Sequence, residues 1–131
     1  MSKAVVDAAI VVDLICGFPA AEPYRGSLAS AEAVAAPAHL DAEVFSALGR
    51  LKRAGLLTRA AERVEALAAF GATRWPLGPL LSPAWALVDR IATRDALYVA
   101  LAVSLDATLI TSDGRLRRRA SGIVTVAEPD E

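Results

Sequence analysis

The stretch that decides the fold is LITSDGRL, residues 109–116, where an apolar run ends abruptly in Ser, Asp and Gly. The apolar side chains of Leu109 and Ile110 favour a short buried strand over residues 107–112. Asp113 is a residue type preferred immediately before a helix, and it predicts a short helix over residues 114–120. A strand that leads straight into a helix is typical of α/β proteins.

The rest of the chain shows the same alternation of short strands and helices. We expect strands at residues 3–7, 33–36, 74–77 and 123–126, and a loop at residues 23–28; residues 9–15 fit either a strand or a helix. We expect helices at residues 40–53, 80–90 and 95–105, and another that Thr58 caps and that runs to Phe70. The alternation predicts an α/β sandwich around a short, mostly parallel sheet.

Two acids stand where strands end. Asp7 closes the first strand and Asp113 follows a later one. Ligands gather at the carboxyl ends of the strands in parallel sheets, so both residues are candidates for a site. Each could instead serve only as a helix cap.

Two further acids lie on predicted helices. Asp95 faces Tyr98, Val99 and other apolar positions one or two turns onward, so its carboxylate lies on a face that we expect to be buried. A buried charge needs a cation, a basic residue or the free N–H groups of its own helix. Glu43 and Asp41 flank the apolar stripe of helix 40–53, and periodicity does not choose between them.

Composition limits the classes of function. The 131 residues carry 14 basic and 15 acidic side chains and are 55% hydrophobic, which fits one domain over residues 1–131 without a global basic field. A lone cysteine, Cys16, fits a reducing compartment. Acids interrupt the apolar N-terminus, and the apolar run at residues 96–103 is too short to span a membrane, so we expect a cytoplasmic protein.

Several carboxylates that meet at one point repel one another unless a cation joins them. An all-oxygen set of ligands suits Mg²⁺ or Mn²⁺ better than zinc. The lone histidine, His39, precedes a helix, and we expect it to cap that helix or face solvent. A local basic patch for nucleic acid could come from the C-terminal arginines, or these could form a solvated helix face: Arg115, Arg117, Arg118 and Arg119.

Four stretches of the chain resemble the PIN-domain ribonucleases, and especially the VapC toxins of type II toxin–antitoxin modules. They are VVDAAIVVDLI at 5–15, PAHLDAEVFSALGRL at 37–51, RDALYVALA at 94–102 and LITSDGRL at 109–116. They occur in the family's order and span nearly the whole chain. Carried over residue by residue, the family's four acids fall on Asp7, Glu43 rather than Asp41, Asp95 and Asp113. Its supporting hydroxyl falls on Thr111; Ala9 stands where relatives often carry Ser.

The resemblance implies a three-layer α/β/α fold and a bacterial or archaeal endoribonuclease that depends on Mg²⁺ or Mn²⁺. It implies metal-binding and catalytic roles for the four acids, contacts of Arg115, Arg117 and Arg118 with RNA, a homodimer and inhibition by a VapB-type antitoxin. The alternative is a catalytically silent PIN fold that binds a protein partner or RNA. A receiver domain fits less well, because the middle of the chain has no Asp at the end of a strand. A haloacid-dehalogenase phosphatase also fits less well, because Asp7 is not followed by a second Asp two positions later.

Overall fold

The computed structural model describes residues 2–130, and its centre is a parallel sheet of four strands. The strands are β1 (Lys3–Val6), β2 (Ala33–Pro37), β3 (Thr73–Trp75) and β4 (Thr108–Ile110). Their order across the sheet is β3-β2-β1-β4, and every pairing is parallel. The predicted α/β sandwich with a short parallel sheet is therefore confirmed.

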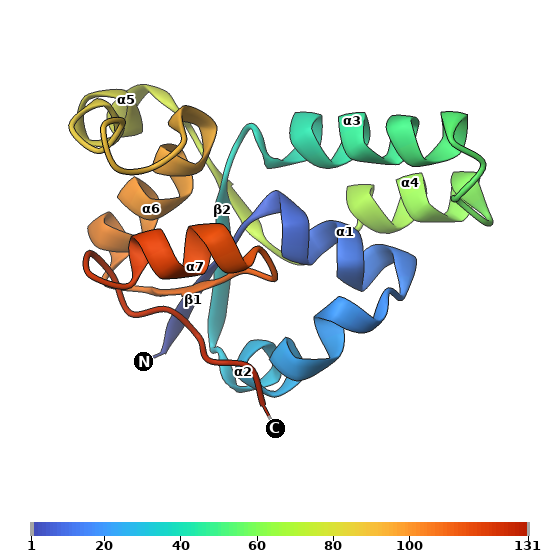
Figure 1. Cartoon of the computed structure of the whole chain (residues 1–131), viewed down its shortest axis with the longest axis horizontal. Helices are drawn as coiled ribbons and strands as arrows, with labels where there is room; N and C mark the ends of the chain where they lie inside the picture. The colour runs from blue at the N-terminus through green and yellow to red at the C-terminus, as the bar shows by residue number, and fades with distance from the viewer. Residues whose placement is uncertain (1, 131) are drawn as a thin grey trace.

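Helices cover both faces of the sheet and make three layers (Figure 1). The connections from β1 to β2 and from β2 to β3 advance in one direction across the sheet, and the connection from β3 to β4 returns. Because parallel crossovers share one hand, the returning helices must lie on the opposite face. One layer holds α1 (Ala8–Cys16), α3 (Leu40–Arg53) and α4 (Ala60–Ala68); the other holds α5 (Gly78–Trp85) and α6 (Thr93–Leu105).

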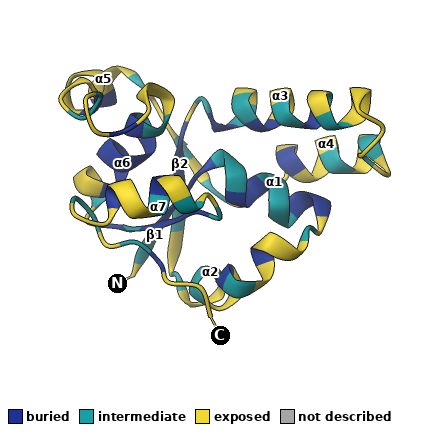
Figure 2. Ribbon diagram, viewed as in Figure 1, coloured by how far each residue is buried: buried dark blue, intermediate teal, exposed yellow. Residues whose placement is uncertain are grey.

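The core lies where the sheet meets α1, α3 and α6. All residues of β1 after Lys3 are buried, and α6 packs across β1, β2 and β4 with an almost wholly apolar inner face. Figure 2 shows this burial concentrated at the centre of the molecule, with the outer faces of α4 and α5 exposed. The short apolar strands can form because helices shield both of their faces from water.

Several predicted segments need correction. Residues 23–28 are not a loop: a 3-10 helix, η1 (Pro19–Tyr24), leads into α2 (Arg25–Ser30). Residues 9–15 belong to a helix. Thr58 does not cap α4, because the N-cap position is Arg59 in the left-handed region. Predicted helix 80–90 begins and ends earlier, as α5, and residues 123–126 contribute only an isolated bridge between Leu109 and Val126. The helix that follows Asp113, α7 (Gly114–Ala120), has the predicted bounds.

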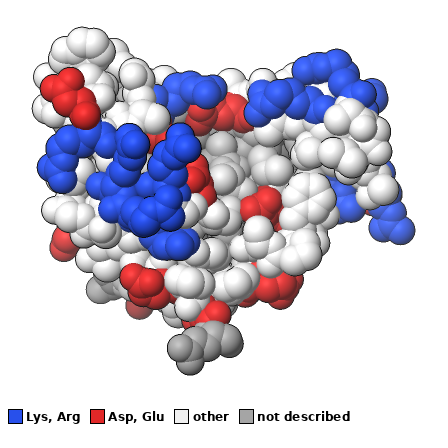
Figure 3. Space-filling model, viewed as in Figure 1, with Lys and Arg blue, Asp and Glu red and all other residues white. Residues whose placement is uncertain are grey.

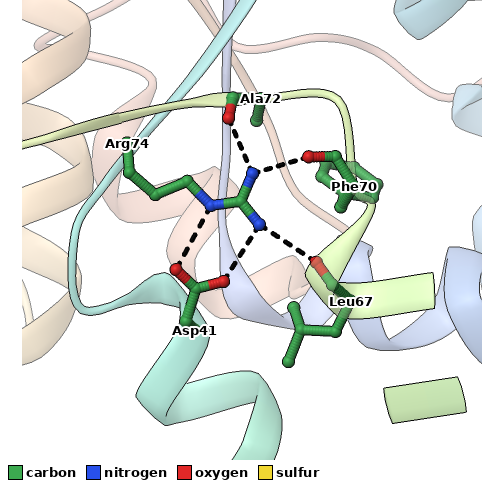
Figure 4. A network of polar contacts seen from close by, with 5 residues as sticks. All are labelled: Asp41, Leu67, Phe70, Ala72 and Arg74. Carbon is green, nitrogen blue, oxygen red and sulfur yellow. Dashed lines mark hydrogen bonds and ion pairs between the residues drawn. The ribbon is translucent and has the colours of Figure 1, made fainter. Parts of the chain in front are cut away.

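Arg74 ties the edge of the sheet to two helices (Figure 4). Its Nε and Nη2 donate to the two carboxylate oxygens of Asp41 at 3.2 and 2.9 Å. Its other donors reach the carbonyls of Leu67, Phe70 and Ala72 at 2.6–3.1 Å. All five guanidinium N–H groups therefore have an acceptor, a pattern that lysine cannot reproduce. We call this group the Arg74 latch; it fixes the N-terminus of α3 against the C-terminal end of α4.

We expect Arg74→Ala to lower the free energy of unfolding by about 2–3 kcal/mol, because three backbone carbonyls and Asp41 lose their donors together. Urea denaturation measures this change. The matched control is Arg25→Ala, which removes an ion pair with Glu22 that is exposed on both sides and should change stability by less than about 0.5 kcal/mol. Equal effects of the two variants would show that the latch does not stabilise the fold.

Candidate functional site

The four predicted acids line one open cavity of about 420 Å³. Asp7 follows β1, Glu43 lies in α3, Asp95 lies in the first turn of α6, and Asp113 follows β4. The cavity opens at the carboxyl ends of β1 and β4. From these two adjacent strands the chain continues towards opposite edges of the sheet, after β1 to β2 and after β4 to the bridge at Val126. Such a topological switch point is where open α/β sheets bind ligands.

Asp7 is the most buried of the four acids, with 3% of its surface exposed. As the N-cap of α1 it accepts a hydrogen bond from the backbone N–H of Ile10 at 3.1 Å. Its other oxygen accepts from the hydroxyl of Thr111 at 2.5 Å, and the Thr111 oxygen in turn accepts from the N–H of Asp113 at 3.0 Å. Thr111 thus joins the acids of two adjacent strands, and Asp7 keeps two donors although Ala9 offers no hydroxyl.

Burial, with a smaller contribution from neighbouring carboxylates, disfavours the charged forms of Asp7 and Asp95. Burial, opposed in part by the bonds from Thr111 and Ile10, raises the pKa of Asp7 to about 7, and the charges of Asp95 and Asp113 add to the rise. Burial also raises the pKa of Asp95, and the charges of Asp113 and Glu43 raise it further. Burial is the larger cause of both shifts, and the neighbouring carboxylates act in the same direction.

Glu43, and not Asp41, faces the cavity, since Asp41 belongs to the Arg74 latch. The hydroxyl of Tyr98 donates to Oε1 of Glu43 at 2.6 Å, and the guanidinium of Arg94 lies 3.4 Å from Oε2. His39 lies 3.4 Å from Oε1. His39 occupies the N-cap position of α3 but forms no side-chain cap, and only 14% of its side chain is exposed, so the prediction of a capping or solvent-facing ring was wrong.

Asp113 is exposed and caps α7, accepting from the N–H groups of Arg115 and Leu116. Asp113 therefore both caps a helix, as its sequence position allowed, and lines the cavity. Of the C-terminal arginines, Arg115 and Arg118 are exposed on α7, whereas Arg117 donates to the hydroxyl of the buried Tyr24.

Sequence reasoning missed several residues that line the same cavity. Asp13 is a fifth carboxylate and accepts from the hydroxyl of Ser112 at 2.6 Å. Ser46 and Arg50 stand one turn apart on α3 and are joined by a 3.0 Å hydrogen bond. The spacing of three residues between Glu43 and Ser46 and of seven between Glu43 and Arg50 places them on one helix face, and this was the available signal.

Charge is divided around the cavity (Figure 3). Basic side chains gather over α7 and along α3, and acidic side chains lie between them. Five carboxylates line the cavity against two guanidinium groups, those of Arg50 and Arg94. A second hollow of about 470 Å³, at the amino end of β4, has Asp106 as the one charged residue in its lining and lacks comparable chemistry.

The donor set fits a hard divalent cation, because it consists of carboxylate oxygens with uncompensated negative charge. The carboxylates line the same cavity but are not close enough together to coordinate one ion. Within residues 2–130, no three His, Cys, Asp or Glu side chains are placed to hold a metal ion. Asp7 directs its oxygens to Ile10 and Thr111, and Asp113 directs one oxygen to the start of α7. The local hydrogen bonds therefore set the carboxylate positions that the structure shows.

The fold and the site define a class: an α/β/α protein with a carboxylate-lined cavity at the switch point of a parallel sheet. The family model described as "PIN domain" matches residues 4–122. Ribonuclease VapC3 of Mycobacterium tuberculosis is 44% identical over 119 residues, which cover 88% of this chain and 86% of that protein. Ribonuclease VapC1 of the same organism is 39% identical, with 88% and 90% covered.

The chain belongs to the PIN-domain family, in its VapC group. Among solved structures, VapBC2 of Rickettsia felis, bound to a DNA fragment from its promoter, has a chain that superposes with a TM-score of 0.68. That match covers 98% of this chain and 99% of the other at 16% identity, so it supports the fold alone. Among residues 2–130, no helix is both long and apolar enough to cross a membrane.

The raised pKa of Asp7 makes stability depend on pH. Its folded-state pKa of about 7 lies above the ordinary value of 3.8, so the folded protein holds this proton more tightly than the unfolded chain does. Asp7 therefore contributes stability at low pH that is lost as the pH rises to about 7. Asp7→Asn has no such proton to lose.

We expect Asp7→Asn to gain stability relative to the wild type by about 2–3 kcal/mol more at pH 8 than at pH 5. Urea denaturation of both proteins in EDTA at the two pH values measures the difference. A difference between the two proteins that is the same at both pH values would contradict the raised pKa.

Proposed function

We propose that this chain is a metal-dependent endoribonuclease that hydrolyses RNA phosphodiester bonds and acts as the toxin of a toxin–antitoxin pair. The observation that carries the proposal is that four acids line one cavity at the sheet's switch point: Asp7 after β1, Glu43 in α3, Asp95 in α6 and Asp113 after β4. Membership of the VapC group, and the fact that its relatives VapC3 and VapC1 are named ribonucleases, support it. An enzyme of this kind would act in the cytoplasm, where RNA is found.

Mg²⁺ or Mn²⁺ is the proposed cofactor, held by the same four acids. When bound, such an ion lowers the pKa of a coordinated water and offsets charge on the phosphate. The chain's own part is to concentrate carboxylate charge in a partly buried cavity and to fix it through Thr111 and the N-terminus of α1. The carboxylates that line the cavity would repel an RNA phosphate, so a cation is needed there for electrostatic as well as chemical reasons.

Arginines beside the cavity supply the positive charge that an RNA backbone needs. Arg50 and Arg94 line the cavity itself, and Arg115 and Arg118 extend from α7. Contacts of this kind bind phosphates and position the strand without reading its bases. We propose a smaller part for Arg117, because its guanidinium is engaged with Tyr24.

RNA cleavage tests the proposal with a matched pair of acids on one helix. Glu43→Gln removes a charge that faces the cavity, whereas Asp41→Asn removes a charge two residues away that belongs to the Arg74 latch. We expect purified wild type to cut total RNA into discrete fragments with Mg²⁺ or Mn²⁺ and not with EDTA. Glu43→Gln should lose at least about 100-fold in rate, and Asp41→Asn should stay within a few-fold.

Equal loss in the two variants would show that charge near the N-terminus of α3, rather than the cavity acid, matters. Absence of cleavage by well-folded, partner-free wild type with both metals would favour the alternative, a catalytically silent PIN fold that only binds a partner or RNA. We expect Asp95→Asn, which changes another acid that lines the cavity, to be inactive as well.

We further propose a VapB-type antitoxin as the partner. VapBC2 of Rickettsia felis pairs a VapC with a VapB, as its name states. The physical rationale is that a partner's guanidinium could enter the acidic cavity and neutralise the charge that a metal would otherwise neutralise. Arg94 already places such a group 3.4 Å from Glu43.

We expect an excess of the antitoxin encoded with this chain to reduce RNA cleavage by at least about tenfold. A VapB-type antitoxin from an unrelated module is the control, and it should leave the rate unchanged. Cleavage that persists with a stoichiometric cognate complex, its formation verified by gel filtration, would contradict this regulation.

A homodimer is part of the same proposal. Leu81 and Trp85 on α5 are 57% and 72% exposed, and exposed apolar side chains of this size are typical of protein contact surfaces. Light scattering of the purified protein measures the oligomeric state directly.

A further inference from the structure

A buried and a partly buried side chain contact one oxygen of Glu43. Tyr98 is fully buried in α6, and its hydroxyl donates to Oε1 at 2.6 Å. The Nε2 atom of His39 lies 3.4 Å from the same oxygen. Oε2 faces the guanidinium of Arg94. The carboxylate of Glu43 is thus held through Oε1, while Oε2 lies beside Arg94, a residue that lines the cavity.

His39 also connects the two helices that carry Glu43 and Asp95. Its Nε2 lies 3.2 Å from the carbonyl oxygen of Arg94, the residue just before Asp95. A carbonyl can only accept, so Nε2 carries the proton and donates. One ring therefore touches the carboxylate of the first acid and the backbone next to the second.

The environment of the His39 ring supports a positional role. The ring packs against Tyr98 with 4.7 Å between centroids, which fixes its plane. Its Nδ1 is buried and has no hydrogen-bond partner in the part of the chain that the structure describes. Buried polar atoms are nearly always paired, so an exception calls for a reason. Here the ring is oriented for its Nε2 contacts and leaves Nδ1 unsatisfied.

We propose that Tyr98 and His39 are positioning residues that present Oε2 of Glu43 to the cavity and set the separation of Glu43 from Asp95. Neither residue is among those that line the cavity, so Tyr98 acts through Glu43, and His39 acts through Glu43 and the Arg94 carbonyl. This inference rests on the proposed metal-dependent function. Outer partners of this kind orient metal-binding carboxylates, and their removal weakens metal binding without removing a ligand.

A double-mutant cycle on Mn²⁺ binding, read by electron paramagnetic resonance, tests the role of Tyr98 without measuring activity. We expect Tyr98→Phe to weaken Mn²⁺ binding by about 10-fold. In a Glu43→Gln background the same change should have less than about a twofold effect, because the residue through which Tyr98 acts is already altered. The matched control is Tyr24→Phe, which removes a buried tyrosine hydroxyl bonded to Arg117 outside the cavity and should not affect Mn²⁺ binding.

His39 is tested by a pair of substitutions. His39→Gln keeps a side-chain N–H that can reach the Arg94 carbonyl, whereas His39→Leu keeps similar bulk without a donor. We expect the Gln variant to retain Mn²⁺ affinity within about threefold and the Leu variant to lose about 10-fold. In RNA cleavage, the Leu variant should lower kcat and leave KM for RNA nearly unchanged, because the phosphate-binding arginines are intact.

The outcomes separate this inference from the function on which it rests. Wild type that binds Mn²⁺ and cleaves RNA, with Tyr98→Phe and His39→Leu unchanged in Mn²⁺ affinity, would overturn the inference alone. An equal loss from Tyr98→Phe in both backgrounds would assign Tyr98 a general structural role and overturn it as well. Wild type that neither binds Mn²⁺ nor cleaves RNA would remove the proposed function and the inference together.

Discussion

A buried carboxylate at the meeting of β1, α1 and β4 is the constraint on which the site depends. Asp7 is almost inaccessible to water, and within residues 2–130 its carboxylate accepts hydrogen bonds from the Ile10 N–H and the Thr111 hydroxyl, which compensate for lost hydration. Those two bonds require that α1 begin directly after β1 and that β4 lie beside β1. The placement of Asp7 therefore depends on the order of the strands, because a different neighbour for β1 would leave Asp7 without its hydrogen bond from Thr111.

The same constraint explains how much could be predicted from the sequence. Asp7 and Asp113 each follow an apolar run, and strand ends of a parallel sheet meet at one edge, so local pattern alone brought these two acids together. Asp95 stood out because its helical neighbours are apolar. The choice of Glu43 over Asp41 came from resemblance, and its physical basis is visible only in three dimensions: Arg74, 33 residues away in sequence, engages Asp41.

The errors share a cause as well. Helix η1, α2 and the shortened α5 are short segments whose bounds depend on packing and not on their own periodicity, and Pro23 and Pro83 lie inside two of them. His39 looked like a capping residue because it precedes a helix. Its contacts are with Glu43 and with the Arg94 carbonyl 55 residues away, and no local pattern reports a contact at that separation. Arg117 looked like its neighbours, but the fold brings Tyr24 against it.

Charge balance gives the cavity a selective character. Five carboxylates line its wall while basic side chains flank it, in a chain whose net charge is only −1. A polyanion therefore meets attraction at the rim and repulsion at the centre, and only a cation at the centre turns the whole surface attractive. The same excess of negative charge can be neutralised by a guanidinium, and Arg94 already lies beside Glu43. The proposed activation by a metal and the proposed inhibition by an arginine-bearing partner would both follow from this one electrostatic feature, because the two cations would compete for the same carboxylates.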